Sequence, residues 1–199
     1  MDEFLAPVTL SSPRATLRPL AAADAPAIAD AVRDGELWKL WFTFVPAPER
    51  VPAWIDEALA QRAAGRALPF AVLDPTGRVV GSTRYMNVDA ANRRVEIGTT
   101  FYGERAQRTA LNTACKRLLL AHAFEAMDCI AVEFRTHFMN HASRRAIERL
   151  GAKLDGVLRA HQRMPDGSLR DTCVYSITHA EWPAVRRHLD FLLDRNPPC

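Results

Sequence analysis

Apolar and polar positions recur with regular periods along most of the chain, and these periods predict its helices and strands. Alternating apolar and polar residues are typical of strands, and apolar residues three to four positions apart are typical of helices. Strands are predicted at 15–20, 68–73, 78–88, 93–101, 129–136, 152–164 and 170–178, and helices at 25–34, 54–64, 111–127, 140–150 and 181–195. This order predicts one α/β domain over residues 1–199, with residues 1–13 as a loosely attached N-terminal arm.

Short turns fix the direction of the central strands. Residues 74–77 and 89–92 have the composition of tight turns. Because loops this short cannot connect parallel strands, the segment 68–101 is predicted to be an antiparallel meander. The strand at 129–136 follows a crossover helix, so it is expected to run parallel to the strand at 93–101 with a right-handed connection.

Capping residues predict where several helices begin and end. Asp24 and Asn140 are expected N-caps. Gly151 is expected to end the helix that Asn140 begins. The helix at 111–127 is apolar nearly all round, so it should be buried against the sheet. The helix at 181–195 is amphipathic and could pack against a second subunit, giving a homodimer.

Composition changes this picture little. Hydrophobic residues make up 48% of the 199 residues and charged residues 25%, as in an ordinary globular protein. No apolar run approaches the ~18 residues that cross a membrane, and the N-terminus has no basic region followed by an apolar stretch. Four cysteines form no CxxC pair and no zinc spacing: Cys115, Cys129, Cys173 and Cys199. A reduced, cytoplasmic setting without a metal is therefore expected.

The placement of charge is more informative than the net charge of +3, which is too slight to indicate nucleic acid. Basic residues gather where the strand at 93–101 meets the helix at 111–127, namely Arg105, Arg108, Lys116 and Arg117. The first N–H groups of a helix lack internal partners, and the helix dipole adds about half a positive charge there. We interpret this turn as a phosphate or pyrophosphate site. The alternative is a solvated helix face.

Three local motifs carry a resemblance to a known family. The first is Val95-Glu96-Ile97-Gly98, and the second is Arg105 to Ala110, set against the pattern Q/R-x-x-G-x-G/A and continuing into Asn112-Thr113. The third is Asn140-x-x-Ser143 followed by Glu148 to Ala152. In this order and spacing, the chain resembles the GNAT superfamily of acyl-CoA-dependent N-acetyltransferases, in its RimJ/RimL-like branch, over roughly residues 10–180.

The resemblance implies a fold and a cosubstrate. The fold is a mixed, mostly antiparallel twisted sheet with a central, splayed parallel strand pair and helices on both faces. The cosubstrate is acetyl-CoA, whose pantetheine arm would lie in the splay between 93–101 and 129–136. The residues implied in binding it are Gly98, Thr99, Arg105, Gln107, Arg108, Thr109, Ala110, Leu111, Asn112, Thr113, Asn140 and Ser143.

The chain departs from the family pattern at two positions. Arg108 stands where the family usually has glycine, which lets the backbone approach phosphates closely, and a left-handed arginine there would be costly. Ile147 stands where many relatives have the tyrosine that protonates the leaving thiolate. Ser143 is a candidate for that role.

The chemistry requires a neutral amine, a polarised carbonyl and a proton for the sulfur. An α-amino group with a pKa of ~7.7–8.0 needs only a modest base, unlike a lysine at ~10.4. The resemblance favours α-amines of proteins or small-molecule amines as acceptors. Glu96 and His161 are the candidate bases, and a strand N–H near Thr99 is expected to bind the carbonyl oxygen. The alternative for Glu96 is an ion pair with Arg84 or Arg94 across the meander.

The acceptor site is expected where the aromatic stretch 36–44, the meander and the last hairpin meet. Trp38, Trp41 and Tyr85 are the candidate acceptor-binding residues. The alternative for 36–44 is a short helix that buries both tryptophans. The pair Arg170-Asp171 could hold a charge of the acceptor, or form a salt bridge within the hairpin.

Other functions lack their usual signals. His137 and His141 are four residues apart, but no HExxH glutamate accompanies them, and phosphate-binding loops of the P-loop and Rossmann types are missing. Two further hypotheses remain beside the enzyme. One is a non-catalytic module of the same fold that binds CoA or a protein partner. The other is a basic nucleic-acid binder.

Overall fold

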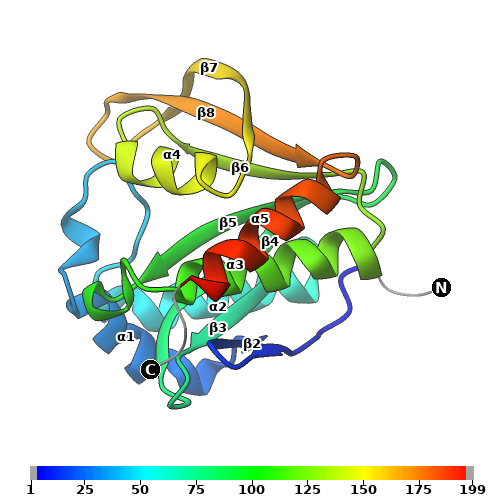
Figure 1. Cartoon of the computed structure of the whole chain (residues 1–199). Helices are drawn as coiled ribbons and strands as arrows, with labels where there is room; N and C mark the ends of the chain where they lie inside the picture. Colours follow the sequence, from blue (N-terminus) through cyan, green and yellow to red (C-terminus); the bar gives the residue numbers. More distant parts are fainter. Residues whose placement is uncertain (1–3, 196–199) are drawn as a thin grey trace.

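An eight-stranded sheet runs through the protein, whose computed structural model describes residues 4–195 (Figure 1). The strand order is β1-β2-β3-β4-β5-β6-β8-β7. The strands are β1 (Leu10–Ser12), β2 (Ala15–Pro19), β3 (Leu68–Leu73), β4 (Val79–Asp89), β5 (Arg94–Tyr102), β6 (Ala131–His137), β7 (Lys153–Arg163) and β8 (Leu169–Thr178). All neighbours are antiparallel except β5 and β6. The predicted fold class is confirmed.

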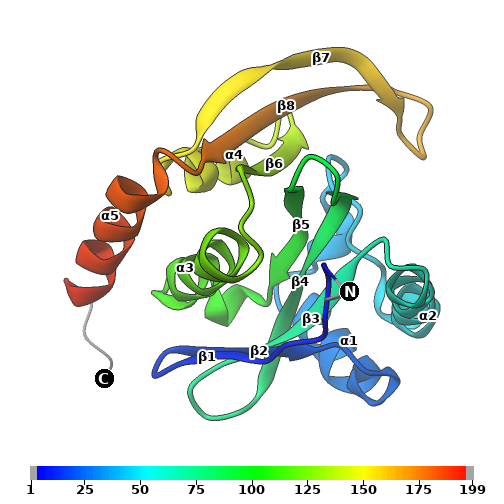
Figure 2. The same ribbon diagram turned by 90° about the vertical axis from the view of Figure 1, so that its right-hand side faces the viewer.

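Helices cover both faces of the sheet (Figure 2). On one face lie α1 (Ala25–Arg33) and α2 (Val51–Ala63), and on the other lie α3 (Leu111–Ala121) and α5 (Trp182–Asp194). The helix α4 (His141–Glu148) packs on β6. No helix within residues 4–195 is both long and apolar enough to span a membrane.

The central strands follow the prediction closely. β3 has the predicted bounds, and the β3–β4–β5 meander is antiparallel. β6 is parallel to β5, as predicted, but it begins at Ala131 and not at Cys129. The Cys129 N–H bonds to the Ala123 carbonyl, and the Ile130 N–H bonds to the Arg93 carbonyl. In the last hairpin, the second strand, β8, pairs with β6 and leaves β7 at the edge of the sheet.

The core between α3 and the sheet is apolar. The helix α3 continues into one π-helical turn, His122–Ala126, and together they cover the predicted helix. Leu119 and Leu120 of α3 are fully buried. Tyr85 is also fully buried, and its hydroxyl donates to the Leu119 carbonyl at 2.6 Å. The structure therefore places Tyr85 in the core and not on an acceptor site.

Residues 4–13 are better attached than predicted, and residues 1–3 of the predicted arm lie outside the described residues. Leu5 is buried in the main hydrophobic core, and β1 pairs with β2. Asp24 precedes α1 but does not cap it with its side chain. Its carboxylate instead pairs with Arg18 at 2.5 Å and accepts the Ala21 N–H at 2.9 Å.

The aromatic stretch does not form the helix that was considered for it. Its helical part is one 3₁₀ turn, Leu37–Lys39. Trp38 packs half-buried against the core between the sheet and α1, whereas Trp41 is 55% exposed. Burial of both tryptophans in a short helix is therefore wrong for Trp41.

The helix α4 begins where it was predicted to begin, but it ends at Glu148 instead of Leu150, and a turn leads from there to Gly151. The Asn140 side chain accepts the Ser143 N–H at 3.0 Å, which satisfies one of the free amides of the first turn. Gly151 terminates the segment with a φ of +98°, and a Cβ there would lie 3.1 Å from the Val185 side chain of α5. Both the backbone conformation and the close packing favour glycine at this position.

Candidate active site

The two parallel strands separate soon after they meet. β5 and β6 pair at only three positions, Arg94 with Ala131, Val95 with Val132 and Glu96 with Glu133. Beyond Glu96 the strands diverge (Figure 1). The splay that the resemblance implies is present.

A β-bulge bends β5 at the point of divergence. Between the pairs of β4 with Gly98 and with Phe101, β5 has two residues, Thr99 and Thr100, where β4 has one, Thr83. Thr99 has a φ of +49°, which is an uncommon conformation for a β-branched residue. An extra residue of this kind bends its strand, and such strain is concentrated at functional sites.

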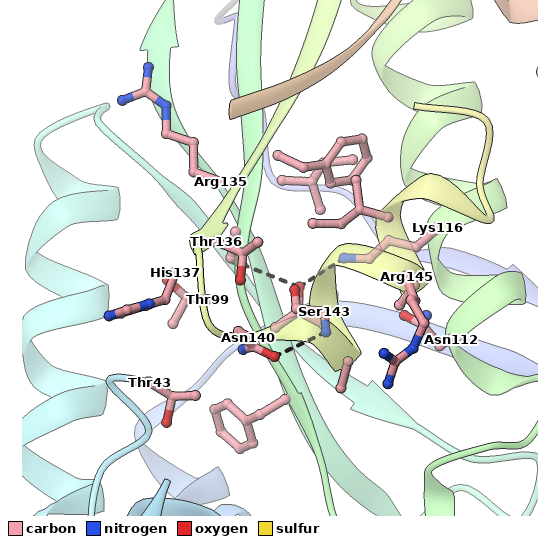
Figure 3. A pocket seen from close by; sticks show the side chains of 18 of the residues that line it. Thr43, Thr99, Asn112, Lys116, Arg135, Thr136, His137, Asn140, Ser143 and Arg145 are labelled. Atoms are coloured by element: carbon pink, nitrogen blue, oxygen red, sulfur yellow. Dashed lines mark hydrogen bonds between the residues drawn. The ribbon is translucent and has the colours of Figure 1, made fainter. Parts of the chain in front are cut away.

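A cavity of about 890 Å³ occupies the splay. Its size is that of a site for a small molecule or cofactor. Figure 3 shows Asn112, Lys116 and Arg145 on one side of it, which we call the helix end. Thr43, Arg135 and His137 lie on the opposite side, which we call the strand end. Asn140 and Ser143 lie between them, and Thr99 is drawn next to His137 (Figure 3).

Free backbone amides open onto the helix end. Within residues 4–195, five N–H groups of the turn before α3 and its first residues have no hydrogen-bond acceptor, namely those of Arg108, Thr109, Ala110, Asn112 and Thr113. The N–H groups of Gln107 and Leu111 are bonded to the Glu104 carbonyl and the Thr109 hydroxyl. The five free donors and the helix dipole form an anion-binding site.

Arg108 adopts the left-handed conformation, with a φ of +58°. Because this conformation costs a non-glycine residue about 1–2 kcal/mol, the predicted cost is present. Arg108 lines the cavity in this conformation.

Two residues predicted to bind the cofactor face elsewhere. The backbone N–H of Arg105 donates to Asp34 at 3.1 Å, and its side chain lies 3.7 Å from the same carboxylate. Arg105 and Leu111 line a second, separate hollow near Arg14 and Asp74. Neither belongs to the cavity in the splay.

Glu96 is the last residue of β5 that pairs with β6, and it is 5% exposed. Its Oε2 accepts a hydrogen bond from Asn87 at 2.6 Å and lies 3.6 Å from Arg135 Nε. Its Oε1 has no hydrogen-bond partner within residues 4–195 and lies over Gly98, 2.9 Å from where a Cβ would be. Burial raises the pKa of Glu96, an effect that Asn87 and Arg135 partly offset. Oε2 of this carboxylate is thus held in place by Asn87, whereas Oε1 is free to accept a proton.

The ion pairs considered for Glu96 are not formed. Arg84 stacks on the Trp54 ring at 5.0 Å, and Arg94 pairs with Glu133 at 2.7 Å. The partner across the splay is Arg135 of β6. This contact joins the two strands at the edge of the cavity.

Lys116 is a buried lysine on the face of α3 that lines the cavity. It is 5% exposed, and its Nζ donates to the Thr100 hydroxyl at 2.8 Å. Within the described chain it forms no ion pair with a carboxylate. Burial lowers the pKa of Lys116 to about 8. The sequence placed this residue at the turn but did not identify it as part of the site.

Helix α4 and its N-cap, Asn140, form part of the cavity wall. Asn140, Ser143 and Ile147 all line it. Ile147 is largely buried and offers no proton. Ser143 stays a candidate proton donor.

The structure places the other candidate base, His161, at the cavity but not the two tryptophans predicted to bind the acceptor. His161 is exposed on β7, lines the cavity and lies 3.1 Å from the Thr172 hydroxyl. Trp38 and Trp41 do not line the cavity, although Trp41 packs edge-on against His137 at 5.1 Å. The neighbouring residues 42–45 line it instead. No group of three or more His, Cys, Asp or Glu side chains in the described part of the chain could hold a metal ion.

Comparisons with known proteins agree with this geometry. Residues 14–153 match a family model described as "Acetyltransferase (GNAT) domain". The Bacillus subtilis (strain 168) protein "Putative ribosomal N-acetyltransferase YdaF" is 29% identical over 106 residues, 53% of this chain and 57% of that protein. The match therefore spans little more than half the length of this curated relative.

Solved structures share the fold over nearly the whole chain. A GCN5-related N-acetyltransferase from Brucella melitensis is 27% identical with a TM-score of 0.83, covering 96% of this chain and 88% of that one. Mycobacterium smegmatis RimJ, solved in complex with CoA-disulfide, is 24% identical with a TM-score of 0.77, covering 94% and 93%. Since the family model matches well over half of the chain, this protein belongs to the GNAT family of acetyltransferases.

Proposed function

We propose that this enzyme transfers an acetyl group from acetyl-CoA to a primary amine by direct attack of the amine on the thioester. The acceptor is an α-amine of a protein N-terminus or of a small molecule. The observation that supports this most is the row of five free amides at the start of α3, which opens onto the same cavity as Glu96. A diphosphate bound there would direct the rest of the cofactor into the splay.

The pantetheine arm would then lie between β5 and β6. Beyond Glu96 the facing edges of these strands are not paired with each other, so their backbone groups can bond to the amides of the arm. Asn140 and Ser143 border the same path. The ligand named for the RimJ structure, CoA-disulfide, is of this class.

Glu96 is the proposed base. An α-amine is partly neutral near neutral pH, so a carboxylate whose pKa is raised by burial suffices to take its proton. The free Oε1 over Gly98 is the atom that would accept it. His161 is the second candidate, and its exposure on β7 makes it the weaker one.

Lys116 is the proposed donor of the proton to the departing thiolate. It is a buried cation that lines the cavity without a carboxylate partner in the described chain. With a pKa of about 8, it can give up its proton and regain it from water near neutral pH. Thr100, which adjoins the bulge at Thr99, holds its Nζ. Ser143 is the alternative donor.

Turnover of an acceptor panel tests the proposal. The enzyme is incubated with acetyl-CoA and with peptides bearing free N-termini, small amines or polyamines, and released CoA is measured. We expect release with at least one class. Calorimetric binding of CoA without any turnover would favour the non-catalytic module. The absence of both CoA binding and turnover would rule out the acetyltransferase and the CoA-binding module alike. RNA binding that weakens steeply with salt would favour the nucleic-acid hypothesis.

Replacing Asn112 by proline is expected to weaken CoA binding about ten- to a hundredfold more than replacing it by alanine. Asn112 is the second residue of α3, and its N–H is one of the five free donors. Proline removes that donor, and a hydrogen bond to a charged group contributes about 1.5–3 kcal/mol. The dissociation constant of CoA, measured by calorimetry for both variants, checks this.

The chain itself shows that proline is tolerated at this position. The second residue of α1, α2 and α5 is Pro26, Pro52 and Pro183. Asn112→Ala is the matched control, because it removes the same contact of the side chain with the Tyr102 hydroxyl but keeps the N–H. Equal affinity of the two variants for CoA would mean that this amide binds no phosphate.

A further inference from the structure

A buried guanidinium lines the cavity on the β8 side. Arg170 lies on β8, is 9% exposed and borders the cavity. Its Nε donates to the Thr172 hydroxyl at 3.0 Å, and its guanidinium lies 5.4 Å from the centre of the Phe44 ring. Within residues 4–195, its two terminal nitrogens have no hydrogen-bond acceptor and no carboxylate lies within salt-bridge distance.

The next residue does not neutralise it. Consecutive residues of a strand point to opposite faces, and Asp171 faces away from Arg170. The Asp171 carboxylate pairs with Arg159 at 2.6 Å and accepts the Ala160 N–H at 2.7 Å. The salt bridge within the hairpin therefore joins Arg159 to Asp171 and leaves Arg170 without a partner.

Glu96 does not neutralise it either. The two charges act on each other across the cavity, but Glu96 Oε2 is held by Asn87 and Arg135. A guanidinium stays protonated at any physiological pH. A buried charge without a partner is costly, and an anion from outside the chain would supply that partner.

A second donor at the strand end also lacks an acceptor. His137 Nδ1 accepts the Met139 N–H at 3.0 Å, so in the neutral ring the proton is on Nε2. His137 Nε2 is buried and has no hydrogen-bond partner within the described chain. The charge of Arg170 also acts on His137, and burial together with this charge lowers the pKa of His137. This side of the cavity therefore holds more donors than acceptors.

We propose that the acceptor carries a carboxylate close to its amine, and that Arg170 binds this carboxylate while the amine faces Glu96. The inference rests on the proposed function. A guanidinium binds a carboxylate through two parallel hydrogen bonds, which fixes orientation as well as affinity. The carboxylate could be the α-carboxylate of a free amino acid or an acidic side chain at the start of a peptide.

Matched acceptor pairs distinguish these two sources. Free glutamate, glutamate α-amide, glutamine and glutamine α-amide are compared, together with peptides that carry glutamate or glutamine at the first or second position. The expected result is a kcat/KM about ten- to a hundredfold higher for the carboxylate-bearing member of at least one pair. Preference for the free α-carboxylate identifies an amino acid, and preference for the acidic side chain identifies a peptide.

Arg170→Met is expected to remove this preference by raising KM for the carboxylate-bearing acceptor about tenfold or more, with little change for its neutral partner. Arg159→Met is the matched control, because it removes an arginine of the same hairpin that faces the other side. The control should keep the preference. An unchanged affinity for CoA in both variants shows that the fold is intact.

The outcomes separate this inference from the proposed function. A wild-type enzyme that acetylates no amine contradicts the proposed function. A wild-type enzyme that acetylates amines without preference for a carboxylate overturns the inference alone. An Arg170→Met variant that loses activity equally on both members of each pair also overturns it, because Arg170 would then be structural.

Discussion

Replacing Glu96 by glutamine is expected to lower kcat about a hundredfold or more while leaving the affinity for CoA unchanged. General base catalysis contributes about 10²–10⁴-fold. Glutamine keeps an oxygen that can accept the hydrogen bond from Asn87, so the side chain should stay in place. The variant loses only the capacity of the free oxygen over Gly98 to take a proton. Steady-state kinetics on the best acceptor, together with CoA calorimetry, checks both parts.

The pH dependence has a definite sign. Burial raises the pKa of Glu96, and the base must be ionised to act, so the wild-type rate should rise as pH rises through that value. Ionisation of the buried carboxyl costs stability, which is therefore greatest below the ordinary pKa of 4.5 and declines as pH rises through the raised pKa. At neutral pH the Glu96→Gln variant should be at least as stable as the wild type.

His161→Ala separates the two candidate bases. His161 lines the same cavity but is exposed, and its ring contacts Thr172. We expect a much smaller loss of kcat than for Glu96→Gln. A large loss in His161→Ala with a small one in Glu96→Gln would assign the base to His161 instead.

The elements that position the site could be predicted because their signals are local. Alternation and two tight turns identify the meander, and the Asn140 cap and Gly151 identify α4. The phosphate turn follows from the backbone itself, since any helix start has free donors. The crossover connection through α3 predicts that β6 runs parallel to β5, and the two strands do pair in this way.

The side-chain contacts could not be predicted, because they depend on elements far apart in the sequence. Tyr85 is a core residue only because α3 lies across β4 and presents the Leu119 carbonyl. The partners of Glu96 come from an asparagine on β4 and an arginine on β6. Leu5 is buried in the main core, and nothing in the sequence around Leu5 indicates this burial.

Lys116 was missed although a signal for it exists. It lies in a helix predicted to be apolar on nearly every face, so one lysine there must be buried or at the edge of a site. Its burial depends on where β5 and β6 separate, and the sequence does not show that position. Trp41 is the opposite case. It was expected to bind the acceptor or to be buried, but it is largely exposed.

Replacing Lys116 by methionine is expected to make the free enzyme more stable and much less active. The difference between the ordinary lysine pKa of 10.5 and about 8 corresponds to about 3 kcal/mol of unfavourable burial of the charge. Methionine has a similar shape without the charge, and replacing a buried charge by an apolar residue is often stabilising. A proton donor that acts in the transition state contributes about a hundredfold or more to kcat.

Two measurements check the Lys116→Met prediction. Below about pH 8, Lys116 is protonated in both the folded and the unfolded chain, so the folded chain bears the full cost of burying its charge. Between about pH 8 and 10.5, Lys116 is protonated only in the unfolded chain, so the stability of the wild type rises with pH. The variant should therefore unfold several degrees higher at pH 7, and this advantage should shrink towards pH 10.5. The wild-type rate should fall as pH rises through about 8, and this alkaline limb should be lost in the variant.

Two further variants make the result specific to Lys116. Lys153→Met removes an exposed lysine paired with Glu181 and should leave the alkaline limb unchanged. Ser143→Ala tests the other candidate donor. A Lys116→Met enzyme that keeps both its rate and its alkaline limb would exclude Lys116 as the donor, and a loss in Ser143→Ala alone would assign the role to Ser143. A variant that is both more stable and about a hundredfold slower is the expected combination, because this lysine is kept at the expense of stability for the step in which the thiolate leaves.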